Sequence, residues 1–168
     1  ANSRYNNITA IDESPLEEGL IYVGTGDGNV WRGDNFGAAW TSLSDGLPDK
    51  YVTDVLGSPT DVDVVYVTYS GYRDNDFLPR IFRSNDQGDT WEDISGDLPD
   101  LAVNELLIVP ETGDSVMFVA ADGGVYGTVT AGTTWERLGN NMPTITVYDL
   151  VINEAKNELV AGTFARSI

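Results

Sequence analysis

Residues 84–91 read Ser-Asn-Asp-Gln-Gly-Asp-Thr-Trp, and a similar stretch, with a glycine followed three residues later by a tryptophan, occurs three times in the chain. Residues 34–40 read Asp-Asn-Phe-Gly-Ala-Ala-Trp, and residues 128–135 read Thr-Val-Thr-Ala-Gly-Thr-Thr-Trp. The three tryptophans, Trp40, Trp91 and Trp135, are therefore spaced by 51 and 44 residues. A matching tail that ends in proline follows each of them, at residues 43–48, 94–99 and 138–143. The chain is built from an internal repeat.

Each repeat unit is predicted to hold four short strands. In the second unit, runs rich in β-branched and aromatic residues predict strands at residues 52–56, 64–69, 80–84 and 90–94. Between them, residues 58–61 and 85–89 carry the Pro, Asp and Gly that are typical of turns. The same pattern predicts strands at residues 8–12, 20–25, 29–32 and 39–43, at 103–109, 115–120, 124–128 and 134–138, and at 147–152 and 159–163.

These units predict an all-β fold of β-propeller blades, because a period of about 40–50 residues is typical of such blades. About three and a half four-stranded antiparallel sheets are expected, over residues 5–48, 51–99 and 102–143 with a partial unit at 145–168. No segment has sustained helical periodicity, so we expect little or no helix. Residues 150–158 would tolerate a helix, but the repeat predicts a turn there.

The composition excludes several classes of function. Nine basic and 27 acidic residues give a net charge of −18, and such a surface repels nucleic acid and anionic membranes. No apolar run is long enough for membrane insertion. The absence of Cys and His excludes disulfides, thiolate chemistry, the usual zinc sites and His-based triads. No cofactor is expected, although the many carboxylates leave calcium binding open as an alternative.

Residues 84–91 match the pattern Ser-x-Asp-x-Gly-x-Thr-Trp, so the chain resembles the Asp-box, or bacterial neuraminidase repeat, proteins over essentially its whole length. That superfamily includes sialidases, sortilin-type receptors, xyloglucanase-type glycoside hydrolases, photosystem assembly factors and many secreted bacterial proteins. The second unit is most similar to the uncharacterised secreted bacterial members. The resemblance implies a propeller of six to eight blades and an extracellular or cell-surface location.

The Asp-box also has a structural interpretation. Asp86 can accept hydrogen bonds from its own turn, Gly88 allows a backbone angle that other residues resist, and Trp91 can bury an apolar face between blades. In the other two copies, Asn35 and Thr130 replace the Asp, which is typical of a folding device rather than a catalytic motif. We therefore assign structural roles to Ser84, Asp86, Gly88, Thr90, Trp91, Asn35, Gly37, Trp40, Thr130, Gly132 and Trp135.

The number of blades predicts a partner. Three and a half blades cannot close a ring of six or more, and an open stack exposes strand edges and apolar end faces. The expected partners are the remaining blades of the same polypeptide or a second copy of the chain. The ending at residues 166–168 favours a fragment of a larger protein, and a small open β unit is a third alternative.

No catalytic residue can be assigned. The sialidases of the family need an arginine cluster, a nucleophilic Tyr with a Glu partner and an Asp acid. Here Arg32 and Arg83 repeat with the blade, which indicates architecture rather than a single site. We therefore predict a non-catalytic extracellular module for binding or structural assembly. The alternative is part of a sialidase- or xyloglucanase-like glycoside hydrolase propeller that uses two carboxylates.

One insertion, residues 70–79, separates the second and third strands of the second unit, where the other units have short links. Exposed loops with aromatic and charged side chains are frequent ligand-binding elements, so this loop could contact a glycan or a peptide. Alternatively, the loop is solvated and its aromatic rings pack on a neighbouring blade. Calcium binding by its two Asp residues is a further alternative. The candidate binding residues are Tyr72, Arg73, Asp74, Asp76 and Phe77.

Overall fold

The computed structural model describes residues 7–139, 141–153 and 155–164, and its strands form four antiparallel sheets. The predicted unit ends at residues 5–6 and 165–168, together with Asn140 and Glu154, lie outside the described residues. The strands of the first sheet are β1 (Ile8–Glu13), β2 (Ile21–Thr25), β3 (Val30–Asp34) and β4 (Ala39–Ser42). The second sheet holds β5 (Tyr51–Gly57), β6 (Val65–Ser70), β7 (Ile81–Ser84) and β8 (Glu92–Asp93). The third holds β9 (Val103–Ile108), β10 (Met117–Ala121), β11 (Gly124–Thr128) and β12 (Glu136–Arg137), and the last holds β13 (Val147–Asn153) and β14 (Glu158–Thr163).

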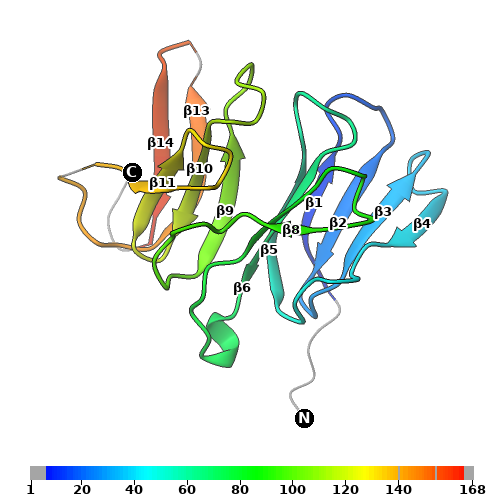
Figure 1. Cartoon of the computed structure of the whole chain (residues 1–168), viewed down its shortest axis with the longest axis horizontal. Coiled ribbons are helices and arrows are strands. Elements are labelled where there is room, and N and C mark those ends of the chain that lie inside the picture. Colours follow the sequence, from blue (N-terminus) through cyan, green and yellow to red (C-terminus); the bar gives the residue numbers. More distant parts are fainter. Residues whose placement is uncertain (1–6, 140, 154, 165–168) are drawn as a thin grey trace.

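Each sheet is a meander in which consecutive strands are hydrogen-bonded neighbours. Figure 1 shows the sheets side by side in chain order, with the first sheet at one end of the row and the two-stranded sheet at the other. The prediction of an all-β chain with four-stranded antiparallel sheets is confirmed. Among the described residues the only helical element is a single 3-10 turn, η1 (Tyr72–Asp74), and none is a helix that could cross a bilayer.

The apolar core lies between the sheets. Alternating strand residues face opposite sides of a sheet, so each blade offers one apolar face to the blade before it and one to the blade after it. Buried residues of β2, β5 and β6 fill the first interface, those of β6, β9 and β10 the second, and those of β10, β11 and β13 the third. Representative members are Tyr22, Val52 and Val67, then Tyr66, Leu106 and Val119, then Ala120, Val125 and Leu150.

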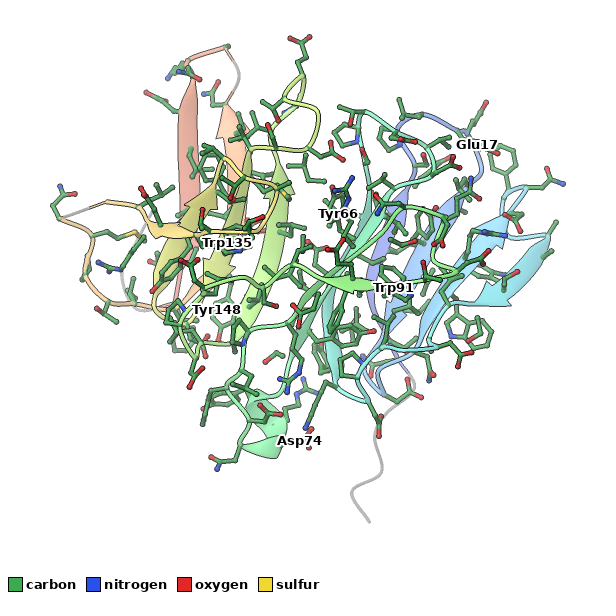
Figure 2. The ribbon with its side chains drawn as sticks, viewed as in Figure 1. Glu17, Tyr66, Asp74, Trp91, Trp135 and Tyr148 are labelled. Atoms are coloured by element: carbon green, nitrogen blue, oxygen red, sulfur yellow. The ribbon has the colours of Figure 1, made fainter. Side chains whose placement is uncertain are left out.

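The repeated indoles bind the preceding sheet. The Nε1–H of Trp91 donates to the carbonyl of Leu43 at 2.9 Å, and that of Trp135 donates to the carbonyl of Ile94 at 3.2 Å. Figure 2 shows these two side chains on successive blades. Trp40 belongs to the first of the described sheets and is 48% exposed, so it does not share the burial of Trp135, which is 6% exposed.

The turns before the indoles explain why the outermost strands are shorter than predicted. In the second blade, the Asp86 carboxylate accepts bonds from the backbone N–H of Thr90 at 2.8 Å and from its hydroxyl at 2.6 Å. In the third, the Thr130 hydroxyl accepts the N–H of Thr134 at 3.0 Å. These bonds hold the threonines in the turn, so β8 and β12 begin later than residues 90 and 134.

The turn in the first blade is built differently. Asn35 and Phe36 both adopt positive φ angles, of 51° and 58°, and Gly37 follows at 78°. The backbone closes this turn, because the N–H of Ala38 donates to the carbonyl of Asp34 at 3.0 Å. Asn35 therefore stands in a left-handed conformation that its equivalents Asp86 and Thr130 do not share.

Candidate ligand-binding site

The innermost strand of every blade carries one extra residue at the same place. The pairing of β1, β5, β9 and β13 with their neighbours skips one position in each strand. Such β-bulges re-aim a side chain and are common next to binding sites. The four bulge residues are Thr9, Thr53, Asn104 and Tyr148.

Three of these side chains tie one blade to the next. The Thr9 hydroxyl donates to the Val52 carbonyl at 2.8 Å. The bulge residue of the second blade, Thr53, donates to the Val103 carbonyl at 3.0 Å. The pattern continues in the third blade, where an Asn104 amide N–H donates to the Val147 carbonyl at 2.8 Å. The bulges therefore lie at one end of the inner strands, in successive blades.

A pocket of about 540 Å³ opens at this end. Its wall includes the bulge residues of the second, third and fourth blades, together with aromatic and polar side chains from the same three blades. A concave site of this size, with several rings and a few convergent polar groups, suits a small molecule or a short polymer segment. The lining residues are Tyr51, Thr53, Ser70, Tyr72, Arg73, Asn104, Asp122, Thr146, Tyr148 and Phe164.

The insertion contributes two of its five predicted residues to this wall. Tyr72 lines the pocket and is 63% exposed, and its ring packs edge-on against Phe77 with centroids 5.9 Å apart. Arg73 also lines the pocket and places its guanidinium 4.0 Å from the centroid of the Tyr51 ring. The Tyr72 ring is therefore mostly exposed and packs against a ring of its own loop.

The two acidic residues of the insertion are engaged by cations of the protein. Lys50 Nζ lies 3.0 Å from Asp74 Oδ2 and 3.4 Å from Asp76 Oδ2, and Arg80 Nη2 lies 2.7 Å from Asp76 Oδ2. The Arg80 contact holds the pKa of Asp76 below its ordinary value. In Figure 2, Asp74 and Tyr148 lie toward the same end of the sheets. Across the described ranges, no three potential metal ligands of the His, Cys, Asp or Glu type come together.

A carboxylate follows the bulge residue in three of the four inner strands. The carboxylate of Asp54 accepts the backbone N–H of Leu106 at 3.1 Å, and that of Glu105 accepts the N–H of Leu150. Burial raises the pKa of Asp54 to about 6 and that of Glu105 to about 7. Both carboxylates form hydrogen bonds between blades, and neither lines the pocket.

The pocket wall holds one carboxylate, that of Asp122. An N–H of the Asn104 amide donates to it at 3.2 Å. Glycoside hydrolases generally use a pair of carboxylic acids on either side of the scissile bond. The described lining residues therefore present hydrogen-bonding groups and rings, but not that pair.

Sequence reasoning missed most of this wall, including Tyr51, Asn104, Asp122, Tyr148 and Phe164. The bulge residues differ in type from blade to blade, so the repeat does not reveal them as a set. One pattern could have indicated them: three of the four directly precede an acidic residue of an inner strand.

Comparison with known proteins shows the same architecture. No family model matches the chain. A xyloglucanase from Paenibacillus sp is 31% identical over 122 residues, in a match that covers 64% of this chain and 12% of that protein. The GH74 xyloglucanase from Xanthomonas campestris superposes with a TM-score of 0.70 and 14% identity, over 88% of this chain and 26% of the other. YCF48 bound to a D1 peptide gives a TM-score of 0.68 and 13% identity, over 98% of this chain and 54% of the other.

These structural similarities confirm the predicted β-propeller fold. The sequence similarity supports a propeller of the xyloglucanase type. The chain spans about an eighth of the curated relative and about a quarter of the xyloglucanase structure. It therefore corresponds to part of the propellers that it resembles.

Proposed function

We propose that this chain is a non-catalytic segment of an extracellular β-propeller and that its pocket binds a glycan. The observation that carries the proposal is the wall of aromatic rings and polar bulge residues at one end of the inner strands. Aromatic rings offer a negative face to the polarised C–H groups of a sugar. Hydroxyl and amide groups such as those of Thr53 and Asn104 can pair with sugar hydroxyls. The Paenibacillus relative is named for an action on xyloglucan, so this polymer is the first ligand to test.

Within this proposal, the five residues of the insertion have two roles. Tyr72 and Arg73 contact the ligand, because both line the pocket. Phe77 supports the Tyr72 ring, and Asp74 and Asp76 anchor the loop through their ion pairs. Loss of an anchoring carboxylate should therefore weaken binding less than loss of the Tyr72 ring.

Affinity electrophoresis in gels that contain xyloglucan tests the proposal. The wild-type chain should be retarded, and Tyr72→Ala should bind about two- to tenfold more weakly, since one aromatic contact is worth about 0.5–1.5 kcal/mol. Phe36→Ala is the matched control, because Phe36 is 65% exposed and lies in the first blade, away from the pocket. A wild-type chain that migrates as in a plain gel would contradict glycan binding at this site.

A second candidate function is a share in glycoside hydrolysis, and the 31% identity to a xyloglucanase favours it. The second carboxylate would then have to come from outside the described wall. Release of reducing sugar from xyloglucan by the wild-type chain, abolished in Asp122→Asn, would support this candidate. Binding without release would support the non-catalytic proposal.

A further inference from the structure

Two lining residues of the pocket carry charge, and the two charges have opposite signs. Arg73 comes from the insertion of the second blade, and Asp122 comes from the turn between β10 and β11 of the third blade. The whole chain has 27 acidic and nine basic residues, so a wall with one cation for one anion is unlike the chain as a whole. The charge that a bound ligand meets is therefore set by these two side chains.

Arg73 forms no ion pair with any carboxylate of the described residues. The two acidic residues next to it in the insertion are engaged by other cations. Lys50 Nζ lies 3.0 Å from Asp74 Oδ2, and Arg80 Nη2 lies 2.7 Å from Asp76 Oδ2. These contacts neutralise the carboxylates of the loop and leave the positive charge of Arg73 uncompensated. A guanidinium is a planar fork of N–H donors, and it binds a carboxylate through two parallel hydrogen bonds.

Arg73 is held in place although its side chain is exposed. Its guanidinium lies 4.0 Å from the centroid of the Tyr51 ring, at the distance of a cation–π contact. The loop beneath it is tightly closed, because the Gly71 carbonyl accepts the N–H of Asp74 at 2.8 Å and that of Asp76 at 3.1 Å. A Cβ on Gly71 would lie only 2.6 Å from the Asp76 carbonyl oxygen. A cation positioned in this way loses less conformational entropy when a ligand binds.

Asp122 offers the complementary group on the next blade. Its Oδ1 atom accepts an N–H of the Asn104 amide at 3.2 Å, and it forms no ion pair with Arg73 or with another cation of the described residues. An ionised carboxylate accepts hydrogen bonds and donates none, so its free oxygen suits a ligand hydroxyl. The wall therefore has one place for an anionic group and a separate place for a hydroxyl group.

We propose that the pocket prefers an acidic glycan, in which Arg73 binds the carboxylate of a uronic acid residue and Asp122 accepts a ligand hydroxyl. This inference rests on the proposed glycan site. A uronic acid carries both groups, whereas a neutral sugar leaves Arg73 without an anionic partner. The charge of −18 opposes an acidic ligand at long range. At about 0.15 M salt that repulsion is largely screened beyond about 8 Å, whereas direct contact with Arg73 is retained.

Isothermal titration calorimetry of the whole chain with trigalacturonic acid and with its methyl ester tests the proposal at pH 7. The two ligands share their sugar rings and differ in charge. The wild type should bind the acid about tenfold more tightly, because hydrogen bonds to charged groups are stronger than neutral ones. Arg73→Gln should reduce this preference to about twofold or less. Arg73→Lys keeps the charge without the fork of donors, so it should retain part of the preference.

Lys156→Gln is the matched control. It also removes one positive charge from an exposed side chain, but Lys156 lies in the turn between β13 and β14, at the far end of these strands from the pocket. This variant should keep the preference of the wild type for the acid. A preference that falls equally in both variants would show a general effect of charge and would overturn the role of Arg73.

A neutral xyloglucan oligosaccharide separates failure of this inference from failure of the proposed function. Binding of the neutral oligosaccharide or the ester with no preference for the acid would overturn the inference and leave the glycan site in place. Absence of binding to all three sugars would overturn both. An acidic peptide that binds more tightly than trigalacturonic acid, through Arg73, would overturn the choice of a glycan as the acidic ligand.

Discussion

The substitution Asp54→Asn should raise the free energy of unfolding, relative to that of wild type, more at pH 8 than at pH 4. Burial is the main reason that the pKa of Asp54 is raised from 3.8 to about 6, against the opposing effect of the Leu106 N–H. Below about pH 4 the group is protonated in both the folded and the unfolded chain. As the pH rises to about 6, the unfolded chain loses this proton first, so the free energy of unfolding falls.

The magnitude follows from the two pKa values. Each pH unit between them corresponds to about 1.4 kcal/mol, so the ionised Asp54 costs the folded chain about 3 kcal/mol above pH 6. Asparagine keeps an oxygen that can accept the N–H of Leu106 and carries no charge. Any constant cost of burying its amide group cancels when the same variant is compared at two pH values.

Urea unfolding monitored by tryptophan fluorescence at pH 4, 5, 6, 7 and 8 measures this effect. The free energy of unfolding of Asp54→Asn minus that of wild type should rise by about 2–3 kcal/mol between pH 4 and pH 8. Asp89→Asn is the matched control, since it removes a charge from an exposed turn of the same blade and should stay within about 0.5 kcal/mol. A difference that is flat, or that falls as the pH rises, would refute the assignment of a buried carboxylate to this interface.

Two further predictions concern the contacts between blades. Gly132→Ala should lower the free energy of unfolding by about 2–4 kcal/mol, because the φ of Gly132 is +89° and a Cβ there would lie 2.7 Å from the backbone oxygen of Ile94. Gly46→Ala, at a φ of +81° with open space around it, should cost only about 1 kcal/mol in the same urea assay, and equal losses would argue against the close approach of the blades. Trp135→Phe removes an indole that is 6% exposed and leaves a buried carbonyl without its donor, so thermal unfolding should show a loss of about 2–3 kcal/mol. Trp40→Phe, at an exposed ring, should change the stability by less than about 0.5 kcal/mol, and a comparable loss there would contradict the difference in burial.

The repeat could be predicted from sequence because the contact that it serves is the same in each blade. Trp91 and Trp135 recur since both bind a carbonyl of the preceding sheet, and Val52 and Val103 are apolar since both are fully buried there. The exposure of Trp40 could not be read from the repeat, because burial at this position comes from a neighbouring blade and not from the residue itself.

The pocket was only partly predictable for a different reason. The length of the insertion indicated Tyr72 and Arg73, which do line the wall. The bulges depend on the register between paired strands, and a register is a property of two segments that a single run of residues does not show. Asn104 and Tyr148 consequently looked like ordinary strand residues.

Amide chemical shifts measured during a titration with a xyloglucan oligosaccharide test the proposed pocket most directly. Binding at the bulged ends of the inner strands predicts that the perturbed amides gather at residues 51–53, 70–73, 104, 122 and 146–148, with those of β3 and β4 unmoved. Spectra that stay unchanged at millimolar sugar, or changes that centre on the first blade, would contradict a glycan site at this end of the sheets.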